Sequence, residues 1–515
     1  MKCRMILLVL LIAGSAALTT AAPQPCESLA AAKFPNTMIS LAVSVPAGDF
    51  TPPTPFTGGN APPSGASFKD LPAFCRVAAT LTPSADSDIK VEIWMPVSGW
   101  NGKFMGVGNG GWAGSISYGQ LRDPLRRGYA VASTDTGHSG GGLEGRFALG
   151  HPEKLIDFGY RAVHEMTVMA KAVVRAFYGP APRFSYWVGG STGGKQGLTE
   201  AQRFPDDYDG IIAGAPVNYW GRVMSHLMWI ARATHDDPAA FVPPDKYPAI
   251  HKAVLDACDA LDGLRDSLVS DPARCSFDPN VLLCSGGEGP SCLTAPQVQA
   301  VKKIYGQAAD PRTGRVISPG LLPGSEIAWH PSAGGTGPFP IVDGYFKYVV
   351  FKNPEWDYRT LDFDRDVRLA DQIADNGLNA TDPDLGKFER HGGKLLLFHG
   401  WSDELISPLN TVEYYESVMK KMGAGRTDAF ARLFMAPGMR HGIGVGPGPN
   451  TFDMIAALEE WVEKGAAPSR IVASHTKDGK VDRTRPLCSY PQQAVYNGSG
   501  DSDDAANFTC KARQP

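Results

Sequence analysis

The segment 184–204 places the strongest constraint on the fold of this chain of 515 residues. It reads FSYWVGGSTGGKQGLTEAQRF, so an apolar run enters a glycine-rich turn and a helix-forming stretch follows. Similar apolar runs occur at 90–97, 103–108, 128–135, 209–216, 393–400 and 432–438, and helical patterns occur at 162–178 and 410–422. Because short strands and helices alternate in this way, the sequence predicts a parallel α/β sheet.

The regular alternation stops between about residues 217 and 385. Strand signals are scarce in this stretch, which contains four tryptophans, four cysteines and many Pro and Gly turns. We therefore expect an α/β domain made of residues 23–217 and 386–515, interrupted by an inserted domain at 218–385.

The N-terminal segment 1–22 is typical of a secretory signal peptide. Lys2 and Arg4 precede an apolar run, and small residues end the segment at Ala21-Ala22. The alternative is an N-terminal membrane anchor, and with either one the rest of the chain would lie outside the cytoplasm. We expect a secreted or periplasmic protein with no other contact with the membrane, because no later apolar run approaches the length of a spanning helix.

The composition is that of an ordinary globular protein, with 43% hydrophobic and 20% charged residues. The formal net charge of −4 offers no basic field that could hold a nucleic acid, so we expect no nucleic-acid partner.

The cysteines indicate disulfides. Nine are present, and eight remain once Cys3 is removed with the signal segment. An even number in an oxidising compartment predicts a disulfide framework, and no CxxC or histidine-rich spacing indicates zinc. Proximity in the sequence favours Cys258–Cys275, Cys284–Cys292 and Cys488–Cys510, which leaves Cys26–Cys75.

The turn at Gly189–Gly193 fits the pattern G-x-S-x-G, with Ser191 at its centre. On such a turn the serine is held in a strained conformation above the sheet edge, and its neighbours must be small for the turn to close. The sequence thus predicts Ser191 as a nucleophile, and a plain glycine turn between strand and helix is the alternative.

A nucleophilic serine needs a base, and in α/β-hydrolases the acid and then the histidine follow the serine along the chain. His441 is the candidate base because it lies on a glycine-rich loop directly after the expected strand 432–438. His475 is the alternative, but it falls within an expected strand.

The candidate acid is Asp403, which follows the expected strand 393–400. Its role would be to hold the imidazole in one tautomer and to stabilise the imidazolium. Glu404 is the runner-up, and a cap before the helix 410–422 is an alternative role for Asp403. We expect His399 to be a structural residue at the strand end.

The oxyanion hole would use the backbone N–H of Thr192 as one donor. A second donor would come from the glycine loop GVGNGGWAG at 106–114, with Gly110 or Gly111 as the candidates. A simple hairpin turn is the alternative function of this loop.

An acidic loop at 258–268 carries Asp259, Asp262 and Asp266 around a glycine. Hard oxygen ligands on such a turn suit Ca²⁺, although the spacing is not that of an EF-hand. A disulfide Cys258–Cys275 would clamp the loop, and a solvated acidic turn is the alternative.

With these motifs the chain resembles the tannase and feruloyl esterase family, which also includes mono(2-hydroxyethyl) terephthalate hydrolase. The resemblance extends from about residue 26 to residue 510 and implies an α/β-hydrolase fold with an inserted lid domain. Its strongest stretches are DFGYRAVHE (157–165), GGKQ (193–196), FPDDYDGIIAGAP (204–216), the acidic loop, LLLFHGWSDELISP (395–408) and LFMAPGMRHG (433–442).

The resemblance implies a secreted serine carboxylesterase that hydrolyses feruloyl, galloyl or terephthaloyl esters through a Ser-His-Asp triad and an acyl-enzyme. It implies Ser191, His441 and Asp403 as the triad, and a small aromatic ester as the partner. It also implies a structural calcium ion in the lid and no organic cofactor. The calcium ligands would be Asp259, Asp262, Asp266 and the backbone carbonyls of Leu264 and Leu268.

The lid would hold the aromatic acyl group, and Trp220, Phe351 and Trp356 are candidates for this contact, although each could instead belong to the core. Two other functions stay open. One is a lipase or peptidase on the same fold, and the other is a non-catalytic binding protein derived from it.

The sequence departs from the family pattern at two positions. Many members have a cysteine just before the nucleophile and another just after the histidine, joined as a disulfide. Here these positions are Gly190 and Gly442. We expect a looser His441 loop, and cysteines at both positions should restore the crosslink and raise thermal stability.

Overall fold

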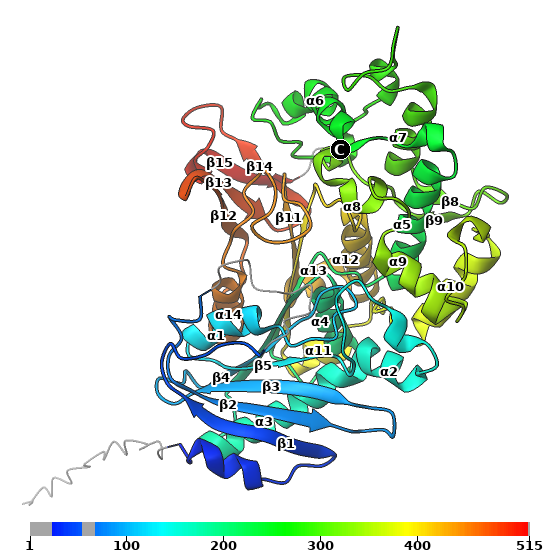
Figure 1. The fold of residues 1–515 in the computed structure, drawn as a ribbon. Helices are drawn as coiled ribbons and strands as arrows, with labels where there is room; N and C mark the ends of the chain where they lie inside the picture. Colours follow the sequence, from blue (N-terminus) through cyan, green and yellow to red (C-terminus); the bar gives the residue numbers. More distant parts are fainter. Residues whose placement is uncertain (1–22, 54–66, 513–515) are drawn as a thin grey trace, which may run out of the picture.

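A nine-stranded sheet forms the centre of the computed structural model, which describes residues 23–53 and 67–512 (Figure 1). The predicted signal peptide at 1–22 lies outside the described residues. The strand order is β1-β2-β3-β5-β4-β6-β7-β10-β11. The strands span β1 (Thr37–Val45), β2 (Phe74–Leu81), β3 (Ile89–Pro96), β4 (Lys103–Val107), β5 (Ala130–Thr134), β6 (Phe184–Gly190), β7 (Gly210–Gly214), β10 (Lys394–Gly400) and β11 (Ala431–Ala436).

The sheet is antiparallel at one side and parallel over the rest. Strands β1, β2, β3 and β5 pair antiparallel in turn, whereas β5, β4, β6, β7, β10 and β11 pair parallel. The seven strands expected from the sequence are all present; six of them pair parallel, as predicted, whereas β3 pairs antiparallel with β5. The sequence did not predict β1 and β2. The sheet-edge strand β1 carries only half-buried and exposed residues, so no continuous apolar run marks it.

Helices cover both faces of the sheet because its strands alternate the direction of their side chains. On β3, Ile93 packs into one core cluster and Trp94 into the other. Helices α3 (Ala162–Tyr178), α4 (Thr192–Arg203) and α12 (Pro408–Met422) contribute to the first cluster, and α1 (Tyr118–Arg126) and α14 (Met454–Lys464) to the second. Among the described helices, none combines the length and the apolar character needed to cross a bilayer.

The chain leaves the sheet after β7 and returns at β10. The intervening helices, drawn in green to yellow, lie together to one side of the sheet, except α11 (Gly386–His391), which packs on the sheet beside α4 (Figure 1). Apart from α11, these helices contribute to a separate hydrophobic cluster that includes Trp220, Trp329 and Tyr345. The elements are α5 (Trp220–His235), α6 (Tyr247–Cys258), α7 (Ala295–Tyr305), β8 (Ala308–Ala309), β9 (Val316–Ser318), α8 (His330–Ala333), α9 (Pro340–Gly344), α10 (Arg365–Asp375) and α11 (Gly386–His391).

Two hairpins follow α14, formed by β12 (Arg470–Lys477) with β13 (Lys480–Cys488) and by β14 (Gln492–Tyr496) with β15 (Phe508–Ala512). Two short helices complete the fold, α2 (Pro152–Ile156) and α13 (Ala424–Asp428). The structure contains the three disulfides that sequence proximity favoured, Cys258–Cys275, Cys284–Cys292 and Cys488–Cys510, and the remaining pair Cys26–Cys75.

Candidate active site

Ser191 lies on a sharp turn between β6 and α4. Its backbone has φ 58° and ψ −120°, a conformation that L residues rarely adopt. The turn closes only because its neighbours lack side chains. A Cβ at Gly189 would lie 2.4 Å from the carbonyl oxygen of Gly193, and a Cβ at Gly193 would lie 3.0 Å from the Cα of Gly108. The local geometry is therefore that of a nucleophile elbow.

Two neighbouring parallel strands bring Asp403 and His441 together. Asp403 follows the end of β10, His441 follows the end of β11, and these strands pair in register. The Nδ1 atom of His441 lies 2.7 Å from Oδ2 of Asp403, within hydrogen-bond distance. The side chain of Asp403 is fully buried and that of His441 is 17% exposed, so the hydrogen bond is shielded from water on the carboxylate side.

Four donors surround the Asp403 carboxylate. Oδ1 accepts hydrogen bonds of 2.9 Å from the backbone N–H groups of Leu405 and Ile406. Oδ2 contacts His399 Nε2 at 3.0 Å in addition to His441. Burial alone would raise the pKa of Asp403, but the charge of His441 and the two histidine hydrogen bonds hold it below its ordinary value. The carboxylate is therefore ionised at neutral pH and raises the pKa of His441.

Two neighbours of the pair have roles that the sequence did not assign. His399, expected to be only structural, links Asp403 to Thr411, whose Oγ1 lies 2.7 Å from His399 Nδ1. Glu404, the runner-up acid, accepts the backbone N–H of His441 at 3.2 Å. Burial and the charge of Asp403 raise the pKa of Glu404 to about 7. The geometry thus favours Asp403 over Glu404 as the partner of the imidazole.

Ser191 and His441 line one cavity of about 630 Å³. Among the described residues no hydrogen bond joins the Ser191 hydroxyl to His441, which is common for catalytic pairs without substrate. The alternative base, His475, lies on β12, where its Nδ1 pairs with Asp482 at 2.6 Å. His475 is absent from the lining of this cavity.

The candidate oxyanion loop lies beside the elbow. Gly110 and Gly111 line the same cavity as Ser191, and Thr192 Oγ1 donates to the Gly111 carbonyl at 2.9 Å. In the described part of the chain, the backbone N–H groups of Thr192, Gly110 and Gly111 donate to no protein acceptor. These three N–H groups are therefore available for a developing oxyanion.

A side-chain pair that the sequence did not single out fixes this loop. Gln196, on α4, accepts the backbone N–H of Asn109 at 3.1 Å and donates to the Asn109 side chain at 3.2 Å. Asn109 in turn donates to the carbonyl of Thr134 at 2.8 Å. The glycine loop is thus tied both to the helix that carries Ser191 and to β5. In the sequence, Gln196 is the last residue of the motif GGKQ (193–196), which could have pointed to this contact.

A smaller apolar pocket adjoins the site. Its walls include Ser191 and His441 together with Trp220, Met224 and Phe339. Of the three aromatic residues named from the sequence, Trp220 lines this pocket. Phe351 and Trp356 line neither cavity and stack on each other, with ring centroids 4.8 Å apart.

In the acidic loop at 258–268, backbone N–H groups donate hydrogen bonds to the aspartate side chains. Asp259 accepts the backbone N–H groups of Asp266 and Ser267 at 3.1 Å each. Asp262 accepts the N–H of Leu264 at 3.0 Å, and burial raises the pKa of Asp262. Arg485 lies 2.8 Å from Asp266 Oδ2 and supplies one positive charge at the loop. The all-oxygen donor set fits the chemistry of Ca²⁺.

Gly190 and Gly442 both line the large cavity. A Cβ at Gly190 would meet only the carbonyl oxygen of Gly214, at 3.7 Å, so a side chain has room there. Gly442 has φ +124°, which a side chain would strain. The two glycines therefore differ in what a replacement would cost.

Comparison with known proteins identifies relatives over most of the chain. The family described as tannase and feruloyl esterase matches residues 75–511. An uncharacterized esterase of Xanthomonas campestris is 40% identical, with 98% of this chain and 94% of that protein covered. A probable feruloyl esterase B-2 of Aspergillus terreus is 32% identical, with 98% of each chain covered.

Solved structures show the same fold. The crystal structure of feruloyl esterase B from Aspergillus oryzae has a TM-score of 0.86 at 31% identity, covering 94% of this chain and 99% of that one. Tannin acyl hydrolase from Aspergillus niger has a TM-score of 0.76 at 24% identity, covering 96% and 94%. The mixed sheet with helices on both faces is thus an α/β-hydrolase fold, as the sequence predicted.

Proposed function

The chain belongs to the tannase and feruloyl esterase family of carboxylic ester hydrolases, and we propose that it is a serine esterase using Ser191, His441 and Asp403. The observation that carries this proposal is the elbow at Ser191. It lines the same cavity as His441, whose imidazole is hydrogen-bonded at 2.7 Å to the buried Asp403.

The proposed reaction has two halves. His441 takes the proton of the Ser191 hydroxyl as its oxygen attacks the ester carbonyl, and Asp403 stabilises the resulting imidazolium. The backbone N–H of Thr192, with that of Gly110 or Gly111, stabilises the tetrahedral oxyanion. His441 then protonates the departing alcohol, and a water molecule activated by the same imidazole releases the acid from the acyl-enzyme.

The lining of the two cavities favours an uncharged aromatic acyl group. Leu143, Ile341 and Ile443 line the large cavity, and no Lys, Arg, Asp or Glu is among the described residues that line either one. A terephthalate monoester carries a carboxylate, and burying it without a cationic partner would be unfavourable. A galloyl group has three hydroxyls that need partners, so we propose a feruloyl-type ester as the preferred substrate.

Two further features of the protein are part of the proposal. The N-terminal segment 1–22 and the four disulfides support export from the cytoplasm. The acidic loop supports a structural Ca²⁺ held by Asp259, Asp262, Asp266 and the carbonyls of Leu264 and Leu268. Residues 218–385 would then form a lid domain with its own core and its own metal.

A panel of four esters tests the proposed function. Methyl ferulate should be hydrolysed faster than methyl gallate, and an aryl terephthalate monoester and tributyrin should be the slowest. A fluorophosphonate should label wild-type protein but not Ser191→Ala. Folded wild-type protein that resists the label would support a binding protein instead, and a preference for tributyrin would support a lipase.

A further inference from the structure

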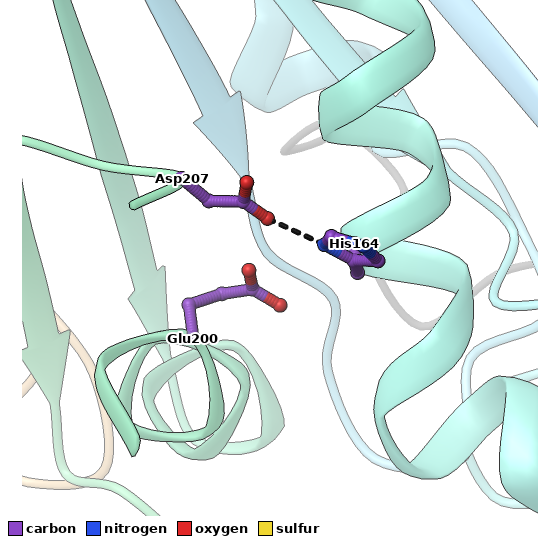
Figure 2. Close-up of side chains that lie close together, drawn as sticks. All are labelled: His164, Glu200 and Asp207. Atoms are coloured by element: carbon purple, nitrogen blue, oxygen red, sulfur yellow. Dashed lines mark hydrogen bonds and ion pairs between the residues drawn. The ribbon is translucent and has the colours of Figure 1, made fainter. Parts of the chain in front are cut away.

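A second cluster of chemically reactive side chains lies away from the candidate active site. In the part of the chain that the structure describes, His164, Glu200 and Asp207 form one group whose ligand atoms all lie within 4.8 Å of one another. Figure 2 shows His164 reaching from α3 toward the Asp207 carboxylate, with Glu200 rising from α4 beneath both. Three separate segments thus converge on one point.

The Glu200 carboxylate has no partner that explains its burial. The residue is 1% exposed, neither side-chain oxygen accepts a hydrogen bond from an N–H group of the described residues, and its close polar neighbour is the Asp207 carboxylate. Among the described residues, no Lys, Arg or His nitrogen lies within 4.0 Å of it as an ion pair. A buried carboxylate that lies beside a second carboxylate and has no direct counter-ion is costly, and a bound cation would satisfy both.

The neighbouring cations are bonded elsewhere. Lys171 on α3 donates through Nζ to the backbone carbonyl of Asp207, and Lys195 on α4 donates through Nζ to the carbonyl of Gly159. Both lysines act on Glu200 only through their longer-range charge. The carboxylate oxygens of Glu200 therefore face His164 and Asp207 without a direct cationic contact.

We propose that His164, Glu200 and Asp207 form a binding site for a divalent metal ion of the zinc type. One imidazole nitrogen and two carboxylates are a ligand set that Zn²⁺ accepts, with water in the fourth position. The His164 side chain is 30% exposed and that of Asp207 is 13% exposed, which gives an ion and its water a route from solvent.

The required adjustment is small. In a tetrahedral site with bonds of roughly 2.0 Å, two ligand atoms lie about 3.4 Å apart. His164 Nδ1 and Asp207 Oδ2 are now 2.7 Å apart, so they would separate by less than about 1 Å to admit the ion. The His164 ring is already oriented, because it stacks on Phe204 with ring centroids 3.9 Å apart.

Bound metal would join α3, α4 and the loop before β7. Because α4 begins directly after Ser191, the ion would anchor the helix behind the elbow while lying outside both cavities at the site.

The test is a zinc titration of the full-length protein after treatment with EDTA, followed by calorimetry and by thermal unfolding. Wild type should bind one Zn²⁺ at pH 7.5, and its Tm should rise. His164→Gln and Glu200→Gln should each weaken this binding by at least about tenfold. Addition of Ca²⁺ alone distinguishes this site from the acidic loop, since calcium should not compete with zinc here.

His391→Gln is the matched control, because His391 also pairs with aspartates, namely Asp206 at 3.3 Å and Asp209 at 3.8 Å, but lies outside the cluster. This variant should keep wild-type zinc affinity. His164→Gln changes a partly exposed side chain and should fold even if Glu200→Gln does not. Zinc binding that is the same in His164→Gln and wild type, or no zinc-dependent change in Tm, would overturn the proposal. Either result would mean that Glu200 and Asp207 only share a proton.

Discussion

Replacing Asp403 with asparagine tests which carboxylate orients His441. Asparagine has almost the same shape, and its Oδ1 can still accept the N–H groups of Leu405 and Ile406. Its amide would donate to His441 Nδ1 across the present 2.7 Å contact. The imidazole would then carry its proton on Nε2, where it cannot accept the Ser191 proton.

The expected loss has two sources, the wrong tautomer and the missing charge opposite the imidazolium. The corresponding change in a serine protease triad lowers kcat on the order of 10⁴-fold, which is about 5 kcal/mol of transition-state stabilisation. We expect a similar loss here because the carboxylate is completely buried and His441 is one of its two side-chain partners. In addition, Asp403 raises the pKa of His441, and only the neutral imidazole acts as base. The kcat/KM of wild type should therefore fall as the pH drops below the raised pKa of His441.

The assay is the pH profile of kcat and kcat/KM on methyl ferulate, with fluorophosphonate labelling to count active sites. Glu404→Gln is the control, since glutamine can still accept the His441 backbone N–H that Glu404 accepts at 3.2 Å. It should change kcat by less than about tenfold and move the acidic limb to lower pH, because a nearby negative charge is removed. If Asp403→Asn kept more than a tenth of the activity while Glu404→Gln lost a thousandfold, Glu404 would be the acid and our reasoning would be wrong.

Three further predictions follow from other parts of the structure. Gly189→Ala should destabilise the fold by about 1–3 kcal/mol, because its Cβ would meet the Gly193 carbonyl, whereas Gly190→Ala should be tolerated; equal melting temperatures for the two would contradict this. Burial raises the pKa of Asp135 to about 7 from an ordinary 3.8, so this carboxyl holds its proton more tightly in the folded than in the unfolded protein. The free energy of unfolding of wild type should therefore fall as pH rises from 5 to 8. Asp135→Asn should remove at most about 3 kcal/mol of that loss, and urea unfolding at both pH values would detect it. The double variant G190C/G442C should form a crosslink detectable by mass spectrometry, but the gain in Tm should be reduced by strain at residue 442, where φ is +124°; a Tm lower than that of its reduced form would refute the predicted stabilisation.

Local patterns in the sequence were sufficient for the parallel sheet, the helix at 162–178 and the strand, turn and helix around Ser191. Each of these depends on the order of apolar and small residues within about twenty positions, and the clash of a Cβ at Gly189 shows why glycine was required. Three disulfides followed from proximity, with separations of 17, 8 and 22 residues, and Cys26–Cys75 was the pair that remained. By contrast, β1 shows no such pattern because its residues are only half-buried or exposed at the sheet edge.

Tertiary structure decided what lies around those residues. The sequence placed Asp403 ahead of Glu404, but the 2.7 Å contact between Asp403 and the imidazole depends on the register of β10 and β11, which no local spacing contains. The roles of His399 and Gln196 depend on contacts made across different elements. The cluster of His164, Glu200 and Asp207 was invisible in the sequence because its members contribute one ligand each from segments that meet only when α3 and α4 pack on the same face of the sheet.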